Sequence, residues 1–206
     1  HYMAGGNVDK DIFDAYSENI RDYKDTIPRL FWYNLAIIIS NGLDHKIGSI
    51  SASYEFFNEW NLLEVNSKES RLDKKMVLFK EVLNKNTLLD IFENFILFNK
   101  KNTKKFFPRY FQYYGVNETF DSFIKKPENK KLGVFWHTQG SGKSTSNIYL
   151  TLKISRKLSE NYTYVILTDT TELDNQIVDD YLDVDAAFNY QHPRTIKGLK
   201  KVLSED

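Results

Sequence analysis

The chain has 206 residues, 41% of them hydrophobic and 15% aromatic, which is enough for one large or two small folded domains. Lys plus Arg and Asp plus Glu both number 28, so there is no overall basic field of the kind that many nucleic-acid-binding proteins carry. The absence of cysteine excludes disulfides and thiolate metal sites and suits a cytoplasmic protein, and no apolar run reaches the roughly 18 residues of a membrane span.

The first part of the sequence predicts one helix and two strands. The opening residues, His1 to Gly6, do not resemble a natural start, so we expect the chain to be a piece of a longer protein. Apolar residues at helical spacing predict a helix from Asp11 to Lys24. The run from Leu35 to Ile39 is typical of a strand buried on both faces, and Lys46 to Ile50 of a strand returning after a turn at Asn41-Gly42.

A boundary between two parts of the chain is predicted near residue 69. The stretch from Glu64 to Asp73 is polar and has no apolar periodicity, and a helix from about Leu72 to Leu83 would bridge the two parts. Thr87 to Asp90 resembles a capping box, with Asp at its last position, which predicts the start of a helix that runs from Leu88 to Phe98.

Four lysines fall in the seven residues from Asn99 to Lys105. Such a run usually forms a solvated loop, and contact with a phosphate is the alternative. Pro108 is well placed as the first residue of a helix from Arg109 to about Lys125, because proline is favoured where a helix begins.

The clearest sign of chemistry is a glycine-rich loop that begins at His137. It fits the end of the phosphate-binding pattern G-x-x-x-x-G-K-[ST], although His137 stands where the first glycine is expected. Gly133 to Trp136 predicts a buried parallel strand before the loop, Ser144 to Leu158 a helix after it, and Tyr164 to Thr168 a second strand. That strand, loop, helix and strand order is the context that the motif requires.

The residue types of the loop suit a nucleotide with Mg²⁺. Gly140 and Gly142 can adopt backbone angles closed to other residues, so that N–H groups and the positive end of the helix dipole meet the phosphates. Lys143 would reach the β- and γ-phosphates, and the Ser144 hydroxyl would bind Mg²⁺. The candidate ATP-binding residues are Gln139, Gly140, Ser141, Gly142, Lys143, Ser144 and Thr145. The alternative, a glycine-rich turn with a solvated lysine, would leave the flanking strand and helix as coincidence.

Two segments outside the loop narrow the class of nucleotide-binding protein. Arg109 and Gln112 are three residues apart at the start of a helix, the spacing with which helicase-like motors read adenine. Downstream, Thr168, Asp169 and Thr171 lie where a strand ends and a helix begins, so hydroxyl and N–H groups there could contact DNA phosphates.

These motifs together resemble the R (restriction and translocation) subunit of type I restriction enzymes, a superfamily 2 helicase-like motor fused to a nuclease. The signature Trp-His-Thr-Gln-Gly-Ser-Gly-Lys-Ser from Trp136 to Ser144 accounts for the histidine. The other matching stretches follow in family order: Tyr33 to Leu35, Ser40 to Gly42, Ile47 to Ser49, Phe57 to Trp60, Leu88 to Asp90, Arg109 to Tyr113, Gly133 to Phe135, Leu167 to Asp169, Leu173, Asp174 and Gln176.

The resemblance implies an α/β fold, in which the C-terminal part of a nuclease-like α/β domain precedes the beginning of a RecA-like P-loop parallel-sheet domain. Residues 1–68 would be the nuclease part, 69–85 a linker helix and 86–206 the partial RecA-like domain. It also implies ATP and Mg²⁺ as cofactors, double-stranded DNA as substrate, and methyltransferase (M) and specificity (S) subunits as partners. Asn19 and Tyr23 match a nuclease Q-x-x-x-Y element with Asn for Gln, and a surface Asn beside a core Tyr explains them equally well.

Two other classes of protein remain as alternatives. A small P-loop kinase or other NTPase would need arginines in a lid after the second strand, where only Arg194 lies. A DNA-binding or interaction module with a vestigial loop would bind no nucleotide. Within the leading interpretation, the chain by itself is expected to be inactive, because we identify no Walker B acid, water-orienting base, arginine finger or nuclease metal ligands in it.

Overall fold

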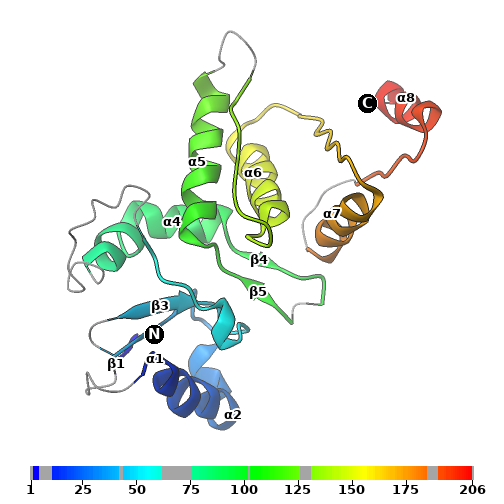
Figure 1. Cartoon of the computed structure of the whole chain (residues 1–206). Helices are drawn as coiled ribbons and strands as arrows, with labels where there is room; N and C mark the ends of the chain where they lie inside the picture. Colours follow the sequence, from blue (N-terminus) through cyan, green and yellow to red (C-terminus); the bar gives the residue numbers. More distant parts are fainter. Residues whose placement is uncertain are drawn as a thin grey trace.

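The computed structural model describes residues 2–4, 11–41, 44–61, 76–101, 103–125, 131–184 and 190–205. These residues form a mixed helix and strand fold with two small sheets. A three-stranded sheet with short helices makes up the N-terminal part, and longer helices make up the rest (Figure 1). The predicted polar boundary region coincides largely with residues 62–75, which lie outside the described residues.

The helix predicted from Asp11 to Lys24 is confirmed. Asp11 caps its start, since the Asp11 side chain accepts a hydrogen bond from the Phe13 N–H. The helix continues without a break and a 3₁₀ turn follows at Pro28. Its successive segments are α1 (Ile12–Asp14), the π-helical η1 (Ala15–Arg21) and α2 (Asp22–Thr26), followed by η2 (Pro28–Phe31).

The N-terminal sheet has the strand order β1-β2-β3. Its strands are β1 (Tyr2–Ala4), β2 (Ile37–Ser40) and β3 (His45–Gly48). β2 and β3 confirm the two predicted strands, and they pair antiparallel with Ile37 opposite Gly48. β1 was not predicted from the sequence, and it pairs parallel to β2. Of the predicted turn between β2 and β3, Gly42 lies outside the described residues.

The sheet is buried on both faces, as the all-apolar run of β2 predicted. Ile37 and Ile39 pack with the N-terminal helices in one hydrophobic cluster, whereas Ile38 and Ile47 belong to a second cluster that also contains Leu78 and other residues of the longer helices. Successive side chains of a strand point to opposite faces, so β2 contributes to both clusters. The sheet therefore joins the N-terminal part of the chain to the helices that follow it.

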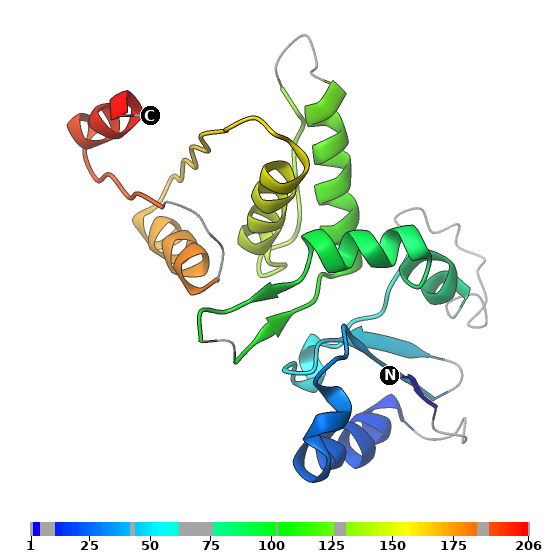
Figure 2. The same cartoon turned by 180° about the vertical axis from the view of Figure 1, so that it is seen from behind.

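The remaining elements follow from residue 76 onward. They are η4 (Leu78–Val82), α4 (Lys85–Asn94), β4 (Leu97–Phe98), β5 (Lys105–Phe106), α5 (Tyr110–Lys125), α6 (Lys143–Lys157), α7 (Thr171–Asp183) and α8 (Ile196–Glu205), with the 3₁₀ turn η3 (Tyr54–Phe56) before them. α5 and α6 lie side by side and α4 crosses near their lower ends, whereas α8 stands at the far end of the molecule (Figures 1 and 2). Within the described part of the chain, no helix combines the length and apolar character that crossing a bilayer requires.

Three local predictions are corrected by the structure. α4 is capped by Asn84, whose side chain accepts a hydrogen bond from Asn86 N–H, so the helix begins before the expected capping box at Thr87. The segments 133–136 and 164–168 are not strands. A strand needs a neighbour to pair its backbone groups, and no described segment lies beside these two in a sheet. The expected parallel sheet is thus not formed by the described residues.

A buried ion pair fixes the arrangement of α4, α5 and α6. The Lys153 ammonium on α6 donates to both carboxylate oxygens of Asp90 on α4, at 2.7 and 2.8 Å, and to Asn117 Oδ1 on α5 at 2.5 Å. The amides of Asn94 and Asn117 donate to the same carboxylate. Burial alone would raise the pKa of Asp90, but the hydrogen bonds and the Lys153 charge hold that pKa below its usual value.

We predict that Lys153→Met destabilises the chain by about 1–3 kcal/mol, because it leaves the half-buried Asp90 carboxylate without its cation. Lys157→Met is the matched control on the same helix, since Lys157 pairs with Glu93 at an exposed position, where an ion pair contributes about 0–1 kcal/mol. Urea unfolding measures both changes. Equal losses for the two variants would contradict a special role for Lys153.

The same ion pair predicts the pH dependence of stability. Because the pKa of Asp90 is lower in the folded than in the unfolded chain, its contribution is fully present above the unfolded value of about 3.9. The contribution is lost as the pH falls through the folded-state pKa. We therefore expect the difference in unfolding free energy between the parent chain and Asp90→Asn to shrink below about pH 4.

Candidate functional site

The glycine-rich loop ends at the start of α6 in the conformation that its glycines predicted. Gly140 and Gly142 both have left-handed backbone angles, with φ of +76° and +81°. Gly142 is the N-cap of α6, and a turn between Ser141 N–H and the Thr138 carbonyl, 3.3 Å, closes the loop before it. The first N–H groups of a 15-residue helix are therefore presented next to the loop, where they attract an anion.

The Lys143 side chain lies across the loop. Its ammonium donates hydrogen bonds to the carbonyls of His137 and Thr138, at 3.1 and 3.0 Å. The residue is exposed, so the ammonium is accessible from solvent. A phosphate at the start of α6 would meet this positive charge. Its oxygens could then accept the hydrogen bonds that the Lys143 ammonium now donates to the loop carbonyls.

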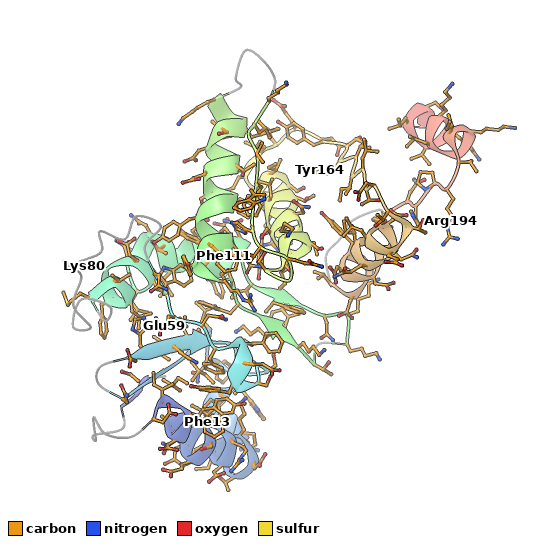
Figure 3. All side chains as sticks on the ribbon, viewed as in Figure 1. Phe13, Glu59, Lys80, Phe111, Tyr164 and Arg194 are labelled. Atoms are coloured by element: carbon orange, nitrogen blue, oxygen red, sulfur yellow. The ribbon has the colours of Figure 1, made fainter. Side chains whose placement is uncertain are left out.

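His137, the residue that replaces the expected first glycine, packs between two aromatic rings. Its ring lies 4.9 Å from that of Phe111 and 4.3 Å from that of Phe135. Burial and the nearby Lys143 charge lower the pKa of His137 below its usual value, so the ring is neutral at neutral pH. Figure 3 shows Phe111 at the first turn of α5, beside the loop.

Gly115 on α5 has a role that the sequence analysis missed. A Cβ at this position would lie 2.2 Å from the ring of Phe135. Only glycine therefore allows the segment before the loop to approach α5 so closely. The sequence signal was a lone glycine inside a predicted helix, which often marks close packing.

Gln112 connects α5 to the loop. The side chain is buried, its Oε1 accepts a hydrogen bond from Arg109 N–H at 2.9 Å, and its Nε2 donates to the Gly142 carbonyl at 3.1 Å. A Cβ on Gly142 would lie 2.8 Å from Nε2, so a larger residue would displace the Gln112 amide in addition to straining the backbone. The structure thus brings Gln112 to the loop, and Arg109 is joined to Gln112 through its backbone N–H.

Asp180 on α7 is a neighbour of the loop that the sequence did not indicate. Burial raises the pKa of Asp180, the nearby Ser144 hydroxyl partly opposes this rise, and the charges of Asp179 and Asp183 add to it. A hydroxyl and a carboxylate oxygen consequently lie together at the first turn of α6, and these are the ligand types that Mg²⁺ prefers. Asp180 lies 36 residues beyond Ser144 in the chain, so no local pattern could have paired them.

The predicted DNA-contacting segment forms the start of α7. Thr170 is the N-cap of α7 and its hydroxyl accepts from Leu173 N–H, while Asp169 and Thr171 are exposed. Thr168 is half-buried, and its hydroxyl lies 3.4 Å from the Asp174 carboxylate.

His192 forms a hydrogen bond with Asp174, on the first turns of α7. The other carboxylate oxygen of Asp174 lies 2.6 Å from Nε2 of His192. The sequence analysis did not single out this pair. Figure 3 places Arg194, two residues further on, on the connection between α7 and α8.

The two residues of the weak nuclease match lie away from the loop, in the N-terminal helices (Figure 1). Asn19 is half-buried in η1, and Tyr23 is 37% exposed in α2. Among the residues that the structure describes, no group of three or more His, Asp or Glu side chains could hold a metal ion. The arrangement therefore gives no geometric support for a nuclease centre at these two residues.

Comparison with known proteins gives one family match and several similar proteins. The SWI2/SNF2 ATPase family matches residues 111–206. The type I restriction enzyme HindI endonuclease subunit of Haemophilus influenzae is 37% identical over 177 residues, which are 81% of this chain and 17% of that protein. MjaIXP of Methanocaldococcus jannaschii, named provisionally as such a subunit, is 29% identical over 188 residues, 80% of this chain and 18% of that protein.

The same kind of protein occurs in a third organism. The type I restriction enzyme SsaAORF53P endonuclease subunit of Staphylococcus saprophyticus is 25% identical over 179 residues, 83% of this chain and 18% of that protein. The chain spans about a fifth of the length of these relatives. The resemblance predicted from the sequence motifs is confirmed by these matches, and a small kinase is not favoured.

Proposed function

Because the chain is a homologue of the endonuclease subunits of type I restriction enzymes, we propose that it binds ATP at the loop before α6 and contributes to ATP-dependent translocation of DNA. In the proposed parent protein this translocation is coupled to DNA cleavage, and the methyltransferase and specificity subunits are its partners. The N-terminal part would be the end of a nuclease-like domain, 69–85 a linker helix and 86–206 the first part of a RecA-like domain.

The observation that carries this proposal is the position of Lys143 at the start of α6. Its ammonium bridges two loop carbonyls directly beside the helix N-terminus, so charge and N–H groups point to one place. Phosphoryl groups are bound by this combination of a lysine charge and backbone donors.

Ser144 and Asp180 would hold Mg²⁺ together with the nucleotide. The Ser144 hydroxyl lies near enough to Asp180 to lower the pKa of that carboxyl, and a hydroxyl with a carboxylate oxygen would fit a small hard cation. The bound ion would neutralise charge on the phosphates. Hydrolysis also needs a group that orients water and a cation for the developing charge, which the proposal does not assign to this chain. We propose accordingly that the chain alone neither hydrolyses ATP nor cleaves DNA.

Gln112 would link the adenine base of ATP to the loop that binds its phosphates. Oε1 accepts from Arg109 N–H, and Nε2 donates to the Gly142 carbonyl at 3.1 Å and reaches the Ser141 carbonyl at 3.5 Å. The open hydrogen-bonding capacity of this amide is therefore the second acceptor site of Oε1. The amino group of adenine is a donor that this acceptor site would meet. Arg109, whose guanidinium lies 6.0 Å from the Phe111 ring centre, is the second residue of this proposed adenine site.

We predict that Lys143→Ala weakens binding of a fluorescent ATP analogue by at least about tenfold, because a charge-assisted contact to the phosphates is lost. The fold should remain intact, since the Lys143 side chain is exposed. Lys157→Ala removes a lysine from the other end of the same helix and should leave the affinity within about twofold. Near-normal binding of the ATP analogue by Lys143→Ala would contradict the proposal that the loop is the nucleotide site.

Gln112→Ala tests the adenine assignment. We expect the variant to lose the preference for ATP over GTP, because the amide that matches adenine is gone, and competition binding with both nucleotides measures it. If ATP and GTP affinities fell by the same factor, Gln112 would serve only to hold Gly142.

The start of α7 is proposed to contact DNA phosphates, because a translocating protein must pass every sequence and phosphate contacts carry no sequence information. We predict that Thr168→Val combined with Thr171→Val weakens DNA binding of the parent protein equally on unrelated duplexes. Fluorescence anisotropy on two duplexes of different sequence measures the effect, with Thr195→Val before α8 as the control. A loss that depended on sequence would show base contacts instead.

A further inference from the structure

A cavity lies away from the glycine-rich loop, where the N-terminal part meets the hairpin of β4 and β5. Its volume is about 440 Å³, within the range of about 300–1,000 Å³ that is usual for ligand sites. Both Figure 1 and Figure 2 show the hairpin lying against the N-terminal part. Among the segments singled out in the sequence, the lysine run contributes Thr103 and Lys105 to this cavity, and the family-matching stretch from Tyr33 to Leu35 contributes Asn34.

The two sides of the cavity are joined by direct hydrogen bonds. The Ser51 hydroxyl accepts from Lys105 N–H at 2.7 Å and donates to the Lys105 carbonyl at 3.1 Å. The Lys105 ammonium donates to the Asn34 carbonyl at 2.8 Å. These contacts span 54 and 71 residues of sequence, so the cavity exists only because the hairpin docks on the N-terminal part.

The polar groups of the cavity are mainly donors. Lys24 and Lys105 line it, and no acidic side chain is among the described residues that do. Burial lowers the pKa of both lysines, which shows that protein groups displace part of the water around each charge. The Asn34 side-chain N–H₂ is buried and finds no acceptor among the described residues. An anion would offset the lost hydration of the lysines, and its oxygens would supply acceptors.

Aromatic rings form the other walls. Trp32 is 64% exposed and Phe98 42% exposed, and both line the cavity. The guanidinium of Arg29 lies 5.6 Å from the Trp32 ring centre and adds a third positive charge nearby. Rings next to cations are the arrangement that binds a nucleotide unit of a single strand, since a base stacks on the ring while the phosphate meets the charge.

We propose that this cavity binds single-stranded DNA, with a phosphate beside Lys24 and Lys105 and an unpaired base against Trp32. A simple phosphate site would have no use for exposed rings, and paired bases in a duplex could not stack on Trp32. The proposed site is separate from the ATP loop and needs no nucleotide. Its failure would therefore leave the proposal for Lys143 unaffected.

Binding of a fluorescein-labelled thymidine oligonucleotide of about 12 nucleotides to the complete chain, without ATP, tests this site. Fluorescence anisotropy should show that Trp32→Ala and Lys24→Gln each weaken binding by about tenfold. Lys24→Gln should also reduce the slope of log affinity against log salt by about 0.7, the value for one phosphate contact on a single strand. Lys105→Gln should weaken binding and reduce the salt slope in the same way, provided that urea unfolding shows the stability of this variant to be unchanged.

Two matched controls separate the cavity from general surface charge. Lys104→Gln removes the adjacent, exposed lysine of the same hairpin, and Trp136→Ala removes another exposed tryptophan outside the cavity. Each should change the affinity by less than about twofold. Equal effects of Lys104→Gln and Lys24→Gln would overturn the site. So would an affinity for a duplex equal to that for the single strand. Inorganic phosphate that competes as well as the oligonucleotide, at the same concentration of phosphate groups, would overturn it too.

Discussion

The arrangement of the helices around the glycine-rich loop depends on one buried charge. Lys153 is 6% exposed and sits on α6, four residues beyond the buried Tyr149, where an unpaired ammonium would be strongly unfavourable. Asp90 from α4 and Asn117 from α5 satisfy it, and the rings of Phe95 and Phe120 lie 5.3 Å away. Since each partner comes from a different helix, one ammonium specifies how three helices meet.

The same helices also hold the loop in position. α5 is held to α6 near its middle by Asn117, and at its first turn by Gln112, which bonds the Gly142 carbonyl. Tyr149 and Phe95 pack between α6 and α4, with ring centres 5.3 Å apart. The loop is thus fixed by buried contacts on its helical side, while Lys143 faces solvent. A rigid support with an exposed charge suits a site whose ligand carries several negative charges.

The extended segments that precede the loop and follow α6 differ in character. Val134, Trp136 and Leu167 are 91, 83 and 84% exposed, although their sequence is typical of buried strands. The backbone there runs extended without a pairing partner among the described residues. The N-terminal sheet shows the opposite case, because β2 has a neighbour on each edge and a hydrophobic cluster on each face.

The sequence by itself determined the local chemistry: the left-handed glycines, the N-terminal helix, strands β2 and β3, and the motifs that identify the family. These depend on residues close together in the chain. Tertiary structure decided what depends on distant neighbours. It left 133–136 and 164–168 unpaired, because strand formation requires a partner. It also placed Asp180 beside Ser144, Gly115 against Phe135, and Lys105 against Asn34, pairs between 20 and 71 residues apart that no local pattern encodes.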